Sequence, residues 1–472
     1  MPTSGRFSVR YLRLGFIGAM IVCAVSGWAC NEKPKPAVAP LAPNDVSWLF
    51  PAPTRAEDLA NLIAVRDLTA PDPQDPAKRD PVWPDAVFKR FVEIVQSPAV
   101  QVAGEPSIGL PAEAQSIDNW YVAGIRIDAG APGLSNDIRA QFGQLPEVRL
   151  IIQPVTRKPD GTPQVDDIAG HLIFNFTLAT LDSPAQAGCL PRPRPDLEKF
   201  SEIVADLAAL RTKLSDGKLG AHKITTAGAP LGVHPGLADA TTANNLRAEM
   251  KSFLEKYISG PRLQAMAIAG LPAGAAKPWI FLSIQGVPPG VDPALPNGGF
   301  DPVHGPTLDG TQFAELIQGA GTVPRVVPEP HTNNLNAITC KNAAVPADVP
   351  IPDRSGVSTA ELFATPAPAA DKVKDNVDVI ADPAKSHFFN TDCVSCHTET
   401  RRAMDLLNVK DVPGIDPAAL PNGQWDVRNF GWGNAGAAGM QATVTRRTAN
   451  ETAAVVAFID SEVLAKHAAA NH

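Results

Sequence analysis

Proline occurs along the whole chain and limits the elements that the chain can form. The sequence has 47 prolines in 472 residues, about twice the usual share. Because proline lacks a backbone N–H and disrupts helix interiors, this content favours loops, sheet edges and extended connections over long helices. Apolar residues make up 44% of the sequence and charged residues 19%, as in a folded globular protein. We therefore expect two or three globular domains joined by many loops.

The charge pattern excludes one class of partner. The formal net charge is −8 and is spread thinly along the sequence. Proteins that bind nucleic acid usually carry a dense basic patch instead. We therefore expect no nucleic-acid partner.

The amino terminus has the pattern of a segment that is removed on export. Arg6, Arg10 and Arg13 precede the apolar run 14–25, and small residues follow it. A positive start, a short apolar middle and a small-residue end are typical of a secretory signal peptide. The run is shorter than the about 20 apolar residues that cross a bilayer, and a signal-anchor helix is the alternative. We predict a signal peptide over residues 1–30.

The end of this segment indicates a lipid anchor. The stretch Ser26-Gly27-Trp28-Ala29-Cys30 resembles a bacterial lipoprotein cleavage site. The resemblance implies that Cys30 is lipidated, becomes the first residue of the mature chain and holds it to a membrane. Residues 31–44 are rich in Pro and Ala and are expected to form a tether. We therefore expect a periplasmic or periplasm-facing outer-membrane lipoprotein, with a freely soluble periplasmic form as the alternative.

Residues 45–350 alternate between strand-like and helix-like segments. Runs rich in Ile, Val, Leu and Phe between Gly and Pro predict strands over 121–128, 148–155, 171–177, 263–269 and 279–285. The second and third are expected to pair as one hairpin, and the last two as another. Apolar residues at helical spacing predict helices over 85–95, 196–214, 244–257 and 311–317. The result is an α+β domain, followed by a linker over residues 351–378.

A short cysteine motif carries the main chemical information in the sequence. Cys393, Cys396 and His397 form the pattern C-x-x-C-H, which attaches haem c covalently. On a starting helical turn the two thiols are placed to reach the two vinyl groups, and the histidine then lies under the iron. A redox dithiol is an alternative, as is a zinc site, but zinc needs a second ligand pair and none has suitable spacing. We expect one covalent haem c (heme c).

The segment around the motif, residues 379–472, resembles class I cytochrome c. The resemblance implies a small all-α domain with a helix before the motif, a methionine ligand in a later loop and a closing helix. We expect the first helix at 385–390 and the closing helix at 451–463, capped by Thr448 or Asn450. Three aromatic residues before Met440 are expected in the core or in the wall of the haem site rather than in an electron relay: Trp425, Phe430 and Trp432.

The resemblance also selects the second ligand of the iron. Met440 lies in a Gly-rich stretch read as a loop, shortly before the closing helix, where the family places this ligand. Met404 follows His397 too closely to wrap around the haem without strain. Three further alternatives are His387, His467 and His472. His171 lies in a predicted strand, and we expect a half-buried sheet histidine rather than a ligand or catalytic residue.

Two cysteines remain once the others have been assigned. Cys23 would leave with the signal peptide, so Cys189 and Cys340 have no other predicted role. Export brings them into an oxidising compartment, which favours a disulfide between them. Two buried free thiols are the alternative.

These features together predict an electron carrier. A Met/His-ligated iron has a closed sixth site and a raised reduction potential, which suits single-electron transfer to a redox partner protein. An enzyme is the alternative, either an oxidoreductase with a substrate site in residues 45–350 or a peroxidase with an open iron. A third class is a haem-containing envelope sensor or binding protein.

Overall fold

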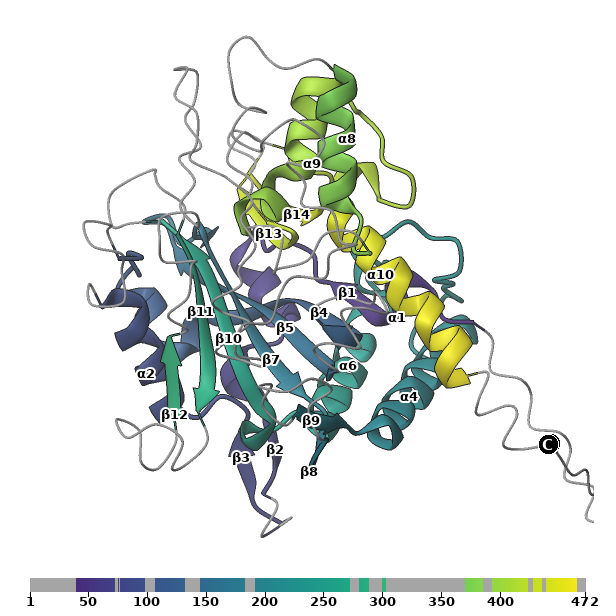
Figure 1. Cartoon of the computed structure of the whole chain (residues 1–472). Helices are drawn as coiled ribbons and strands as arrows, with labels where there is room; N and C mark the ends of the chain where they lie inside the picture. Colours follow the sequence, from purple (N-terminus) through teal and green to yellow (C-terminus); the bar gives the residue numbers. More distant parts are fainter. Residues whose placement is uncertain are drawn as a thin grey trace, which may run out of the picture. The chain divides into compact units, whose positions relative to one another are not determined.

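A single antiparallel sheet organises most of the described residues of the computed structural model (Figure 1). The structure describes residues 40–72, 75, 77–97, 107–131, 145–182, 192–271, 280–287, 299–302, 370–384, 393–422, 428–434 and 439–464. They belong to one structural unit, Val38–His472. Predictions that concern residues 1–39, including the signal peptide and Cys30, lie outside the described residues.

The sheet has eight strands in the order β1-β4-β5-β7-β10-β11-β12, with β6 paired to β5. The strands are β1 (Ser47–Leu49), β4 (Trp120–Ala131), β5 (Leu145–Arg157), β6 (Pro163–Val165), β7 (Ile168–Asn175), β10 (Leu263–Gly270), β11 (Ile280–Val287) and β12 (Gly299–Pro302). Each of the five predicted strands falls on one of them to within a few residues. The predicted pairings β5–β7 and β10–β11 are both antiparallel and are confirmed.

The two predicted hairpins belong to one sheet because β7 also pairs with β10. The turn around Gly161, which has a positive φ of 83° and therefore suits glycine, joins β5 to β6 rather than directly to β7. Near the amino terminus β1 adds to β4. Leu41 and Asn44 are already buried in the fold, so it includes the end of the segment predicted as a tether.

Cross-strand pairing gives the sheet two different faces. One row of partners, from β1 to β11, consists of Trp48, Ile125, Leu150, Leu172, Met266 and Ile284. We call the face that these residues define the apolar face. The neighbouring rows point the other way because side chains alternate along a strand. They carry Ser47, Arg126, Glu147, Arg149 and His171, and we call this side the polar face.

Helices pack against the aromatic residues that belong to the sheet. They are α2 (Asp85–Gln96), α4 (Leu197–Ser215) and α6 (Ala243–Tyr257), and they confirm three of the predicted helices. Phe253 of α6 lies edge-on to Trp48, with ring centroids 5.2 Å apart. Phe91 of α2 lies edge-on to Trp120 of β4 at 5.9 Å. The fourth predicted helix, 311–317, lies outside the described residues.

The carboxyl-terminal part contributes three helices and a hairpin. The helices are α8 (Ala370–Ala381), α9 (Cys393–Leu407) and α10 (Arg446–Phe458), the last continued by a π-helical segment over Ile459–Leu464. The predicted boundary between linker and haem domain, at 378, falls inside α8. Strands β13 (Phe430–Asn434) and β14 (Met440–Val444) pair antiparallel. The all-α character of 379–472 stays a prediction, because the segment is described only in part.

Two local predictions in this part were wrong. Met440 begins strand β14 and does not lie in a loop. The closing helix starts at Arg446, five residues earlier than predicted, and its cap is Thr445, whose side chain accepts a hydrogen bond from Thr448 N. The core assignment of Phe430 and Trp432 is confirmed, since both are buried. Trp432 exchanges two hydrogen bonds with the Gln153 side chain of β5, which fixes the hairpin on the sheet.

None of the helices within the described ranges has both the length and the apolar character that crossing a membrane requires.

Candidate functional site

The C-x-x-C-H residues open helix α9. Cys393 is its first residue, and Cys396 and His397 follow one turn later. Residues i, i+3 and i+4 of a helix share one face, so the three motif positions line up on the same side of α9. Cys396 and His397 are each partly exposed. The prediction that the motif lies on a starting helical turn is confirmed.

The motif helix holds the start of α10. The hydroxyl of Thr400 accepts a hydrogen bond from Arg446 N at 2.8 Å, and the Glu399 carboxylate accepts one from Arg447 N at 3.1 Å. The first N–H groups of a helix have no partner within it, so both contacts satisfy donors that would otherwise be unpaired. Burial raises the pKa of Glu399 to about 7, against the lowering effects of Arg446 and of the hydrogen bonds that the Thr400 hydroxyl and Arg447 N donate to the Glu399 carboxylate.

Arg447, the second residue of α10, connects the motif helix α9 to α8. Its guanidinium is buried and pairs with Glu451 at 2.9 Å. It also donates to the carbonyl oxygens of Ile380 and Asp382. Burial opposes its charge, but Glu451 and the negative charge of a Cys396 thiolate raise the pKa of Arg447. Arg447 therefore lies close enough to Cys396 to interact with it electrostatically.

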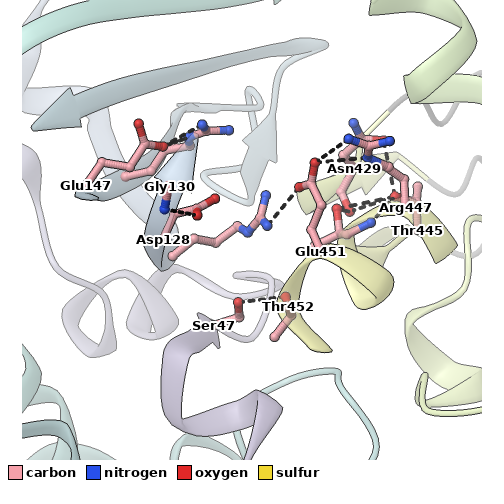
Figure 2. A network of polar contacts seen from close by, with 12 residues as sticks. Ser47, Asp128, Gly130, Glu147, Asn429, Thr445, Arg447, Glu451 and Thr452 are labelled. Carbon is pink, nitrogen blue, oxygen red and sulfur yellow. Dashed lines mark hydrogen bonds and ion pairs between the residues drawn. The ribbon is translucent and has the colours of Figure 1, made fainter. Parts of the chain in front are cut away.

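Glu451 joins α10 to the sheet. One carboxylate oxygen accepts from Arg447, and the other accepts from Arg126 of β4 at 2.9 Å (Figure 2). Burial would raise the pKa of Glu451, but Arg447, Arg126 and Arg149 outweigh it and lower the value to about 2. Glu451 is therefore an ionised carboxylate shared by cations from the helix and from the sheet.

Further charged side chains of the polar face lie near Glu451. Arg149 of β5 donates to Glu147 through Nε at 2.9 Å. His171 of β7 has a pKa well below its ordinary value, because of burial first and then the positive charges of Arg149, His397 and Arg126. His171 and His397, which are far apart in the sequence, are therefore near enough to influence each other.

Met440, the second ligand predicted from the sequence, lies against β6. Its Sδ atom accepts a hydrogen bond from Val165 N at 3.0 Å, and its side chain is partly buried against the core. Val165 pairs with Val155, whereas His171 pairs with Ile151, four residues earlier on β5. At about 3.3 Å per residue, roughly 13 Å of strand separate these two positions.

The remaining predicted site residues divide into two groups. Met404 lies on α9 and packs against the core. Five residues lie outside the described ranges, so their predicted roles stay predictions: Cys189, Cys340, His387, His467 and His472. Within the described ranges, no three His, Cys, Asp or Glu side chains gather as a metal site.

Sequence reasoning missed Arg126, Arg447 and Glu451. A charged residue between Ile125 and Ile127 in an apolar strand was one available signal, because it indicates a face that is not simply core. The spacing of Arg447 and Glu451, four residues apart on a helix, was another. Neither signal reveals that β4 and α10 lie in contact.

Comparison of the chain with models of protein families, with characterised proteins and with solved structures finds no match.

Proposed function

We propose that this protein is an exported c-type cytochrome that carries one covalently bound haem and transfers single electrons. The observation that carries the proposal is the placement of Cys393, Cys396 and His397 on one face at the start of α9. Cys393 and Cys396 would form the thioether links, and His397 would ligate the iron. The bound group supplies a redox centre that alternates between ferrous and ferric iron.

The surroundings of the motif fit an anionic haem. Haem has two carboxylate side chains, which need cationic or hydrogen-bonding partners when they are partly buried. Arg126, Arg149 and Arg447 gather at this place with the carboxylates of Asp128, Glu147 and Glu451. The Nε atom of Arg126 is buried and lacks a hydrogen-bond partner among the described residues. The chain therefore has unused donor capacity where the haem carboxylates would need it.

This chain's own residues would also shape the electron path. Cys396 and His397 are partly exposed, whereas Glu399 and Thr400, one turn farther along α9, are buried and hydrogen-bonded to the start of α10. The buried turn would keep the ligand helix in place during oxidation and reduction, and the partly exposed first turn would leave an edge for a redox partner protein.

The cellular setting is proposed from the sequence alone. Export through the segment 1–30 would deliver the chain to the compartment where haem c is attached, and lipidation of Cys30 would hold it at a membrane. Mass spectrometry of the mature amino-terminal peptide tests this: a diacylglyceryl cysteine at Cys30 is expected. An unmodified amino terminus in the soluble periplasmic fraction would contradict the anchor.

Covalent haem is tested in a bacterial host that assembles c-type cytochromes. We expect the exported wild type to retain haem absorption and peroxidase-type staining on a denaturing gel. The double variant Cys393→Ala/Cys396→Ala should lose both on the gel, because no sulfur link remains. Ser395→Ala, between the two cysteines, is the matched control and should stain like the wild type. Staining that persists in the double variant, or no haem in the wild type, would overturn the proposal.

A further inference from the structure

The polar face of the sheet is covered by the elements that surround the haem motif. Glu451 of α10 reaches Arg126, and Thr452 is hydrogen-bonded to Ser47 of β1 at 2.9 Å (Figure 2). Phe430 of β13 packs so closely over Gly124 that a Cβ atom there would lie 2.7 Å from its ring. Helix α9 is in turn fixed to the first residues of α10. Successive contacts thus connect the motif helix to β1, β4 and β5.

His171 occupies a central position on this face. It lies in the middle of β7, between its partners Ile151 on β5 and Ala267 on β10. Its neighbours Gly170 and Leu172 are buried on the opposite side, so the imidazole projects from the polar face. On the neighbouring strand β10 this face carries only small side chains, those of Ala265, Ala267 and Ala269.

We propose that His171 is the second axial ligand of the iron held by His397, so that the haem lies between α9 and the polar face. The proposal rests on the proposed function and concerns only how the haem is held. Helix α9, which carries His397, is joined through the start of α10 to Arg126, which projects from the same sheet face as His171. His397 also lies near enough to His171 to act on it electrostatically. Two histidines from separate parts of the chain thus come together, as an iron ligated from both sides requires.

The same geometry disfavours Met440. Its sulfur already accepts the Val165 N–H, and the register of β6 on β5 places that contact roughly 13 Å along the strand from the His171 pairing. The two donor atoms of an axial pair face each other across a single iron atom. A haem with His171 as its second ligand would therefore lie away from Met440, whose sulfur would have to give up the Val165 hydrogen bond to ligate iron.

The haem carboxylates would then lie toward the arginines. Arg126 and Arg149 project from the same face as His171, and their row is separated from the His171 row by one apolar row that points the other way. Asn175 follows on the same strand face, and its Oδ1 atom is buried without a hydrogen-bond partner among the described residues. Two histidine ligands would give a lower reduction potential than a histidine and a methionine. The protein would thus be a more reducing electron carrier than the sequence alone suggests.

The test is the ferric absorption and electron paramagnetic resonance spectrum of the full-length holoprotein. We expect the wild type to be low-spin and to lack a Met–Fe charge-transfer band. His171→Ala should become high-spin and bind added cyanide rapidly, and free imidazole should restore a low-spin spectrum. His171→Met retains a ligand, so it should stay low-spin, gain the Met–Fe band and show a raised reduction potential. This second variant keeps the test valid if the alanine variant fails to fold.

Two comparisons complete the design. His222→Ala, an exposed histidine, is the control and should leave the spectrum unchanged. Met440→Leu should also keep the wild-type low-spin spectrum. A Met–Fe band in the wild type that disappears in Met440→Leu would overturn the assignment of His171, as would a low-spin spectrum that survives in His171→Ala. Either result requires covalent haem and leaves the proposed function intact, whereas a wild type without covalent haem would overturn that function itself.

Discussion

At the residue scale, Glu451 balances the positive charges of Arg126 and Arg447, which are both buried. Without its carboxylate, Arg126 and Arg447 would face each other with less compensation. Removing one partner of a buried ion pair costs more than the pair itself contributes, because the remaining charge is left unpaired.

We therefore expect Glu451→Gln to lower the free energy of unfolding by about 3 kcal/mol, because it leaves two arginines without their shared anion. Urea unfolding followed by tryptophan fluorescence measures the change. Glu202→Gln is the matched control, since Glu202 pairs with Lys199 at the surface and its loss should cost less than about 1 kcal/mol. Equal effects of the two variants would show that Glu451 does not act as a buried link.

His234 gives the fold a pH dependence that is separate from the candidate site. It is 3% exposed, and its Nδ1 atom accepts a hydrogen bond from Gly236 N at 3.1 Å, which caps the short helix α5 (Pro235–Ala238). Burial lowers its pKa to about 3. The folded state therefore binds this proton less readily than the unfolded chain, whose histidine has a pKa near 6.5.

The sign follows from the depressed pKa: this contribution is fully present above about pH 6.5 and is lost as the pH falls toward 3. Between pH 7 and pH 5 we expect a loss of about 2 kcal/mol in the free energy of unfolding from this group. His234→Asn keeps a capping side chain but does not titrate, so its stability should fall less over this interval. Parallel urea titrations at both pH values compare the two proteins. Identical losses would contradict the assignment.

At the element scale, the start of α10 depends on another helix. Its amino-terminal N–H groups are satisfied partly by Thr445 and partly by Glu399 and Thr400 of α9. A cap supplied from a neighbouring helix couples the stability of α10 to the position of the haem motif.

Removal of the Thr400 hydroxyl should weaken that coupling. Thr400→Val leaves Arg446 N without its acceptor in a buried place, and the expected cost is about 1 kcal/mol, as for other lost caps. Thr400→Ser preserves the acceptor and should stay within about 0.5 kcal/mol of the wild type. Thermal unfolding of the three proteins, monitored by circular dichroism, decides between these outcomes. If valine and serine behave alike, the hydroxyl has no capping role.

Element prediction from the sequence worked where periodicity is strong. The apolar stripe of α4 and the alternating strands β5, β7 and β10 are visible in the chain itself. The β13–β14 hairpin escaped detection because the glycines in Phe430–Asn434 favour a loop when read alone. Trp432 of this hairpin is held by distant residues: the Gln153 side chain donates to its carbonyl and accepts from its backbone N–H, and the Phe50 carbonyl accepts from its indole. Such long-range partners have no local signature.

The candidate site shows the same division. The motif Cys393, Cys396 and His397 was recognisable because its chemistry requires adjacent residues in a fixed pattern. Arg126, His171 and Glu451 were not recognisable as its neighbours, because each comes from a different element and only the sheet register and the packing of α10 on the sheet bring them together. The sequence therefore revealed the motif but not the residues that surround it.

At the scale of the whole molecule, the carboxyl-terminal segment shares its core with the sheet. Trp432 is fully buried, and its indole Nε1 donates to the carbonyl of Phe50 at 2.9 Å. Val444, Val455 and Ile459 are buried in the same hydrophobic cluster as Leu150 and Trp48. A carboxyl-terminal fragment without the sheet would expose several of these large apolar side chains and would leave Glu451 without Arg126.

We therefore expect residues 370–472, produced alone, not to fold as an independent cytochrome domain. The fragment lacks Gln153, Phe50 and Arg126, so Trp432 loses its hydrogen-bond partners and Glu451 loses one of its cations. Burial of apolar area provides most of the stability of a small domain, and about 100 residues without this interface have little to replace it. Near-ultraviolet circular dichroism and a thermal melt measure the outcome, with the full-length protein as the reference. A cooperative transition with native-like aromatic signals in the fragment would show instead that the segment is a separate domain, resting on the sheet without depending on it.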